Sequence, residues 1–91
     1  MITVESAPTA LGWDTEVEVV EGKRRSRHNV RVSRDDLGRW GAPGEDGPED
    51  LVHRAFEFLL QREPADQILK SFELRDILRY FPEFDQEMRR S

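Results

Sequence analysis

The chain has 91 residues, a formal net charge of −5 and no cysteine, so we expect one small domain without disulfides or thiolate metal sites. Leu, Ile, Val and Phe make up about a quarter of the sequence, above the roughly 20% below which charged chains tend to stay disordered. No apolar run approaches the roughly 18 residues of a membrane span, and the amino-terminal segment lacks a signal-peptide pattern, so we expect a cytoplasmic protein without membrane contact.

The first thirteen residues carry weak structural signals. Ile2 and Val4 could begin a short strand, but Pro8 and the small residues around it favour a loosely held arm. We therefore predict an amino-terminal arm over residues 1–13, followed by a single α+β domain over residues 14–91.

Two segments, 15–21 and 27–33, alternate apolar and polar residues in the way typical of half-buried strands. The five residues between them begin with Gly22, which can supply a positive φ, so the pattern predicts a β-hairpin. Val20 falls on the outward face of its strand. This leaves open whether a third strand or a partner covers it.

A short helix is predicted over residues 34–40. Ser33 and Asp36 have the spacing of a capping box, in which a side-chain oxygen and a carboxylate satisfy each other's backbone N–H groups. Leu37 and Trp40 lie three positions apart and would both turn inward. The glycine- and proline-rich segment that follows is predicted to be a loop.

A long helix is predicted to begin at Pro48, because proline suits the first helical turn. The apolar side chains of residues 51–60 cover an arc of about 200°, twice the roughly 100° stripe of a surface helix. We therefore expect the hairpin to cover this helix on one side and the carboxyl-terminal helices to cover it on the other.

The last part of the chain is divided by Pro64 and Pro82, and each proline disfavours helix in the residue before it. Apolar spacing predicts short helices over residues 65–71 and 74–81, and a last turn follows near the carboxyl end. The predicted fold class is therefore α+β: an amino-terminal β-hairpin packed on one long helix plus short carboxyl-terminal helices.

The string from Phe58 to Phe84 has the pattern FLLxREPxxxILxxFxLxxIxRYFPEF. It resembles a group of small, uncharacterised prokaryotic proteins that have an amino-terminal strand pair before this string. The resemblance extends over about two-thirds of the chain. It implies a shared fold, and it implies no activity, cofactor or functional residue.

Residues 23–34 carry six cations and no acid, which makes them a candidate for contact with nucleic acid through phosphate neutralisation. However, two of the arginines share a predicted sheet face with Glu16 and Glu18, so cross-strand ion pairs would satisfy part of the charge. No aromatic residue between the cations could stack on bases. The candidate nucleic-acid contacts are Lys23, Arg24, Arg25, Arg27, Arg31 and Arg34.

Metal binding and catalysis have little support in the sequence. His53 and Glu57 lie four apart on the main helix and would provide only two metal ligands, and His28 shares the inward face of its strand. No nucleophile motif is present, and a domain of this size leaves little room for a pocket of about 300 Å³. We therefore predict no catalytic, cofactor-binding or metal-binding residues, and no enzyme activity.

Three aromatic residues and a methionine form the candidate partner patch, although a small domain could equally close over all of them. Tyr80 falls at the edge of the apolar face of its helix, and partly exposed apolar patches often mark protein interfaces. The members of this candidate patch are Trp40, Tyr80, Phe84 and Met88. The function predicted is a small non-enzymatic interaction or regulatory module that binds a protein partner or a second copy of itself, and the alternative is a nucleic-acid-binding module.

Overall fold

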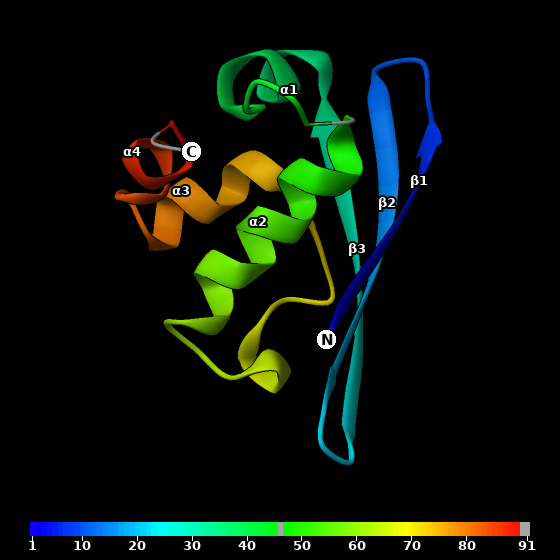
Figure 1. Cartoon of the computed structure of the whole chain (residues 1–91), viewed down its shortest axis with the longest axis vertical. Helices are drawn as coiled ribbons and strands as arrows, with labels where there is room; N and C mark the ends of the chain where they lie inside the picture. Colours follow the sequence, from blue (N-terminus) through cyan, green and yellow to red (C-terminus); the bar gives the residue numbers. More distant parts are fainter. Residues whose placement is uncertain (46, 90–91) are drawn as a thin grey trace.

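A four-stranded sheet forms one layer of the fold, and the helices cover one of its faces (Figure 1). The computed structural model describes residues 1–45 and 47–89. The first three strands pair as antiparallel neighbours, and the short fourth strand pairs in parallel with the third. The strands are β1 (Ile2–Pro8), β2 (Gly12–Glu21), β3 (Arg24–Ser33) and β4 (Ser71–Glu73). The α+β class and a three-stranded amino-terminal sheet are thus confirmed.

Strand β1 occupies the place where the sequence predicts a loosely held arm. It pairs with β2 along its whole length, from Ile2 opposite Val19 to Pro8 opposite Trp13. Ile2 and the next inward residue, Val4, are half-buried against the core. Residues 2–8 are therefore an edge strand, which is the third strand that the position of Val20 left open.

The hairpin between β2 and β3 is tighter than predicted. Only Gly22 and Lys23 connect the strands, and Glu21 lies opposite Arg24. Gly22 has a φ of 61° while Lys23 has a negative φ, as in the type II′ turns that match the twist of antiparallel strands. The predicted five-residue connection was too long because the ladder continues through the basic residues.

Helix α1 (Arg34–Trp40) has the predicted bounds, and its capping box is present. The backbone N–H of Asp36 donates to Ser33 Oγ over 3.0 Å, and the Asp36 carboxylate accepts from the Ser33 N–H. Trp40 is buried and Leu37 is half-buried, so both turn inward as expected.

Helix α2 (Pro48–Leu60) begins at the predicted proline, but it has only 13 residues. The expected single long helix is therefore not observed, and in residues 1–45 and 47–89 no helix is long and apolar enough to cross a membrane. Strands β1 and β2 contact α2 on one side, and α1 and α4 (Phe84–Arg89) contact it elsewhere. The wide apolar arc is covered as predicted, and its side chains from Leu51 to Leu59 form the centre of the core.

The segment after α2 differs most from the prediction. Instead of a helix over residues 65–71, the chain forms the 3₁₀ turn η1 (Ala65–Gln67) and then enters β4. Pairing with β3 supplies the backbone hydrogen bonds that a helix would have made, including Asn29 N–H to the Lys70 carbonyl over 2.7 Å. The predicted helix over 74–81 is a 3₁₀ turn, η2 (Leu74–Asp76), continued by the single turn α3 (Ile77–Tyr80).

Candidate functional site: an apolar groove beside the carboxyl-terminal helices

The predicted partner patch is not a surface patch. Trp40, Phe84 and Met88 are at most 4% exposed, whereas Tyr80 is 64% exposed. The Trp40 indole packs edge-on against the Phe84 ring and donates its N–H to Asp85 Oδ1 over 2.9 Å. Three of the four residues therefore build the core between α1 and α4, and only Tyr80 is available to a partner.

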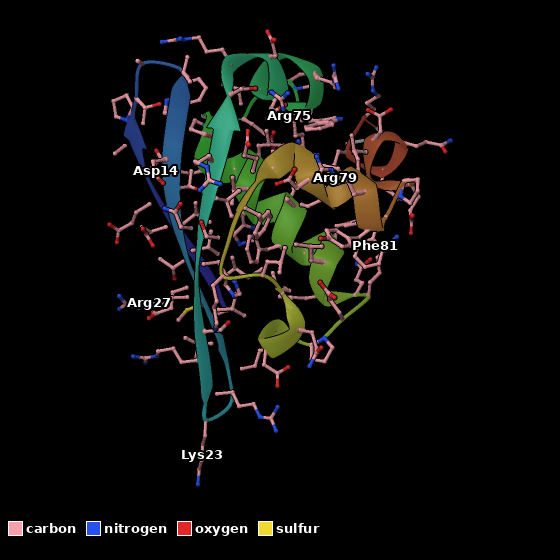
Figure 2. The ribbon with its side chains drawn as sticks, turned by 180° about the vertical axis from the view of Figure 1, so that it is seen from behind. Asp14, Lys23, Arg27, Arg75, Arg79 and Phe81 are labelled. Atoms are coloured by element: carbon pink, nitrogen blue, oxygen red, sulfur yellow. The ribbon has the colours of Figure 1, made fainter. Side chains whose placement is uncertain are left out.

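Tyr80 instead lines an apolar groove of about 360 Å³ between the end of α2, the η1–β4 segment and α3. Four buried side chains form its base, and Phe81 lies on the helical side of the molecule, away from the sheet (Figure 2). Leu69 is 52% exposed. The apolar lining consists of Leu59, Ile68, Leu69, Phe72, Ile77, Tyr80 and Phe81. We call this site the carboxyl-terminal groove.

The polar residues of the carboxyl-terminal groove are Glu63, Gln67 and Asp76, and none of its ten lining residues carries a positive charge. One Asp76 oxygen accepts the N–H of Glu73 over 3.1 Å, which fixes that carboxylate at the groove. The site therefore combines an apolar interior with a negatively charged edge. Such a combination favours an apolar ligand that carries a cation.

The volume of the carboxyl-terminal groove is larger than the sequence predicted for any pocket. A chain of 91 residues was expected to leave little room for a pocket of about 300 Å³, yet the groove reaches about 360 Å³. The groove is lined in part by residues of the η1–β4 segment, where a helix was predicted over residues 65–71. In this segment Leu69 lies outside the core.

A buried histidine holds the groove segment against the sheet. The His28 ring, 1% exposed, packs on the Phe56 ring and lies 2.8 Å through Nδ1 from the carbonyl oxygen of Leu69. A carbonyl oxygen can only accept, so Nδ1 carries the proton, and the neutral ring accepts at Nε2 from the Ser26 hydroxyl over 2.9 Å. The Leu69 backbone is thus fixed while its side chain faces solvent.

Burial lowers the pKa of His28 below its ordinary value, the nearby positive charge of Lys70 lowers it further, and the hydrogen bond to Leu69 opposes both. Because the imidazole is buried, its neutral form is favoured. The inward position predicted for His28 is therefore confirmed, and its ring serves a structural purpose beside the groove.

The six candidate nucleic-acid contacts lie on the hairpin and at the start of α1, with Lys23 at the far tip of the hairpin (Figure 2). Arg25 and Arg27 lie 3.8 and 3.4 Å from Glu18, and Arg24 lies 3.8 Å from Asp66. Such exposed pairs contribute at most about 1 kcal/mol each and leave the cations accessible.

The two remaining arginines of this set are used within the fold. Arg31 donates to Ser71 Oγ over 3.1 Å, and Arg34 donates to the carbonyl oxygen of Ala10 over 3.0 Å. Neither pairs with Glu16, which instead accepts from the amide of Asn29. The basic segment is consequently divided between the hairpin tip and the opposite end of the sheet.

A second depression, of about 630 Å³, lies between the β1–β2 connection and the start of α1. Residues of both charges line it, and Arg34 is held there by Ala10. Its mixed charge and internal contacts provide no preference for one kind of ligand. The carboxyl-terminal groove is therefore the stronger candidate.

Within residues 1–45 and 47–89, no cluster of three or more His, Asp or Glu side chains could hold a metal ion. His53 Nδ1 lies 3.4 Å from Glu57 Oε1, as expected for an ordinary pair on a helix surface. The remaining histidine, His28, is occupied by Ser26 and Leu69.

Arg54 is an important residue that the sequence pattern places on the polar face of α2. Its side chain is only 17% exposed and forms a fork on Glu45, at 2.6 and 2.9 Å. It also donates to the carbonyl oxygens of Trp40 and Met88, at 2.6 and 3.0 Å. Arg54 thus joins α1, the following loop and α4 to α2, and no short motif identifies such a long-range contact.

The comparisons with known proteins do not assign this site. The chain matches no protein-family model, no curated protein and no solved structure.

Proposed function

We propose that the protein is a small, cytoplasmic, non-enzymatic interaction module whose carboxyl-terminal groove binds an apolar segment of a partner protein. The observation that carries this proposal is the exposure of Leu69 and Tyr80 beside a largely buried apolar base. Large exposed apolar side chains gathered at a concave site favour binding, because their burial removes apolar surface from water.

The charge of the groove suggests the chemistry of the partner segment. Glu63 and Asp76 lie at the groove, and none of the described residues that line it carries a positive charge. A segment with one or two large apolar side chains next to Lys or Arg would fill the interior and complement these carboxylates. At about 360 Å³, the groove suits a few side chains, as in the recognition of short peptide segments.

Selection from a random peptide library against the immobilised protein tests this proposal. We expect enriched peptides to combine aromatic or aliphatic residues with flanking Lys or Arg. Leu69→Glu places a charge at a half-exposed position, so the variant should fold and lose the selected peptides. Leu11→Glu makes the same change at an 82% exposed leucine outside the groove and should retain them.

Two outcomes would reject the groove as the partner site. One is enrichment of peptides rich in Asp and Glu, since the groove carboxylates would repel them. The other is equal binding of selected peptides by the Leu69→Glu and Leu11→Glu variants. A library without any enriched peptide would count against peptide recognition by this protein.

A second candidate function is nucleic-acid binding by the hairpin tip. Lys23 lies at this tip, clear of the helices (Figure 2), and Arg24 and Arg25 follow it at the start of β3. Phosphate contact requires accessible cations of this kind. Labelled DNA and RNA titrated at low and moderate salt would show binding that weakens steeply with salt. Loss of that binding in the Arg24→Ala/Arg25→Ala variant would support this function, and no binding at low salt would eliminate it.

A further inference from the structure

The free edge of β1 carries a set of backbone groups that the fold does not use. Met1 and Val20 exchange two hydrogen bonds, of 2.7 and 2.9 Å. In an antiparallel pair such exchanges occur at every second residue, so the N–H and C=O groups of Ile2, Val4 and Ser6 point away from β2. Within residues 1–45 and 47–89, no other segment hydrogen-bonds these groups.

We propose that β1 pairs antiparallel with β1 of a second copy, with Val4 opposite the Val4 of that copy. This contact uses a surface separate from the carboxyl-terminal groove and does not depend on the function proposed for it. The two sheets would join into one continuous sheet across a twofold axis, as in other isologous dimers.

Backbone geometry limits the choice of register. Opposing residues can exchange hydrogen bonds only if the backbone N–H and C=O groups of both point away from β2. The residues that face one another must therefore come from Ile2, Val4 and Ser6. With Val4 at the centre, Val4 of one copy pairs with Val4 of the other, and Ile2 of each copy pairs with Ser6 of the other. This register forms three hydrogen-bonded pairs with two bonds each, the largest overlap that these three residues allow.

The neighbouring registers are poorer. A shift of two residues in one direction would place Glu5 opposite Glu5 and Ile2 opposite Pro8, which has no N–H to donate. A shift in the other direction would pair Ile2 with Val4 and Thr3 with Thr3, so fewer hydrogen-bonded pairs would form among the three outward-facing residues. In the Val4-centred register, Glu5 instead lies opposite the uncharged Thr3 of the second copy.

Side-chain burial supports the same register. Ile2 and Val4 are half-buried on the helical face of the sheet and pack against the core from its border. Pairing would place the two Val4 side chains side by side across the axis and reduce their exposure to water. Ser6 is held to α2 by its hydrogen bond to Glu49, so β1 is already ordered for pairing.

Sedimentation equilibrium of the full chain from about 1 to about 200 µM tests the proposal. We expect a reversible monomer–dimer equilibrium. Val4→Pro removes the central N–H from the free edge but not from the β1–β2 ladder, and proline is tolerated at such edge positions. This variant should remain folded by circular dichroism and be monomeric.

A charge-exchange series tests the register without a change in backbone. Thr3→Glu would face Glu5 of the second copy at two symmetric positions, so its dimer dissociation constant should rise about two- to thirtyfold. The double variant T3E/E5K pairs opposite charges and should reverse that rise. Leu11→Glu adds the same net charge outside the paired segment and should leave the dissociation constant unchanged.

A wild-type chain that stays monomeric throughout this range would overturn the proposal. A dimer whose dissociation constant responds equally to T3E and L11E, or that is not recovered in T3E/E5K, would also overturn it. Neither result bears on peptide binding by the carboxyl-terminal groove. Loss of peptide binding in the Leu69→Glu variant would likewise say nothing about the pairing of β1 strands.

Discussion

His28 couples the core to the carboxyl-terminal groove. Its ring lies between Ser26 in β3 and the Leu69 carbonyl, so its protonation state affects the segment that carries the exposed leucine. The sequence predicted its inward position from strand alternation. It could not predict the contact with Leu69, because the two residues lie 41 positions apart.

We predict that acidification destabilises the protein through His28. Its folded-state pKa lies below the unfolded value of about 6.5, so the unfolded chain binds the proton more readily. The stability contributed by the neutral ring is complete above about pH 6.5 and is lost as the pH falls towards the folded-state pKa. Urea unfolding, followed by tryptophan fluorescence, should therefore give a lower free energy of unfolding at pH 5.5 than at pH 7.5.

The variant His28→Gln is the control for this pH response. It should be less stable at neutral pH and show little change between about pH 7 and pH 5. The pKa values of Glu45 and Asp85 are lowered mainly by hydrogen bonds from Arg54 and Trp40, so these carboxylates respond at lower pH. An unchanged pH slope in the variant would contradict the assignment to His28.

Arg54 is predicted to contribute strongly to stability although it lies on the polar side of α2. Arg54→Lys keeps the charge but loses the fork on Glu45 and at least one bond to a carbonyl oxygen. We expect a loss of about 1–3 kcal/mol in the free energy of unfolding. Arg79→Lys, at an exposed arginine of α3, should change it by less than about 0.5 kcal/mol. Equal losses in the two variants would contradict this account.

At the scale of elements, the sequence predicted correctly those helix ends that are determined by residues close together in the chain. The bounds of α1 follow from its cap, and the start of α2 follows from Pro48. The segment 65–71 was predicted wrongly because its conformation depends on β3, which lies about 40 residues earlier in the chain. Parallel pairing of three residues there outweighs a helical spacing of apolar side chains.

The capping box gives a direct test at this scale. Ser33→Ala removes the oxygen that accepts the Asp36 N–H, and we expect a loss of about 1 kcal/mol in the free energy of unfolding. Ser71→Ala is the control, since its hydroxyl accepts a hydrogen bond from exposed Arg31. Thermal unfolding should give a lower midpoint for the Ser33 variant than for the control. Equal midpoints would show that the cap contributes little.

At the scale of the whole molecule, the wide apolar arc of α2 predicted a helix covered from two sides, and the layers agree with it (Figure 1). The apolar pattern of the sequence could not show which apolar residues remain exposed to solvent. Trp40, Phe84 and Met88 were candidates for a partly exposed patch, yet the closure of α1 and α4 over α2 buries them. Leu69 was expected in a helix and became exposed, so the groove could not be predicted.

The most direct test of the account is a map of amide chemical shifts on adding a short synthetic peptide with central Phe and Leu flanked by Lys. We predict shifts at Gln67 to Leu69 and at Tyr80 to Phe81, which line the groove. The same peptide with Glu in place of Lys should bind far more weakly. Shifts confined to the hairpin tip, or equal responses to both peptides, would contradict the carboxyl-terminal groove as the partner site.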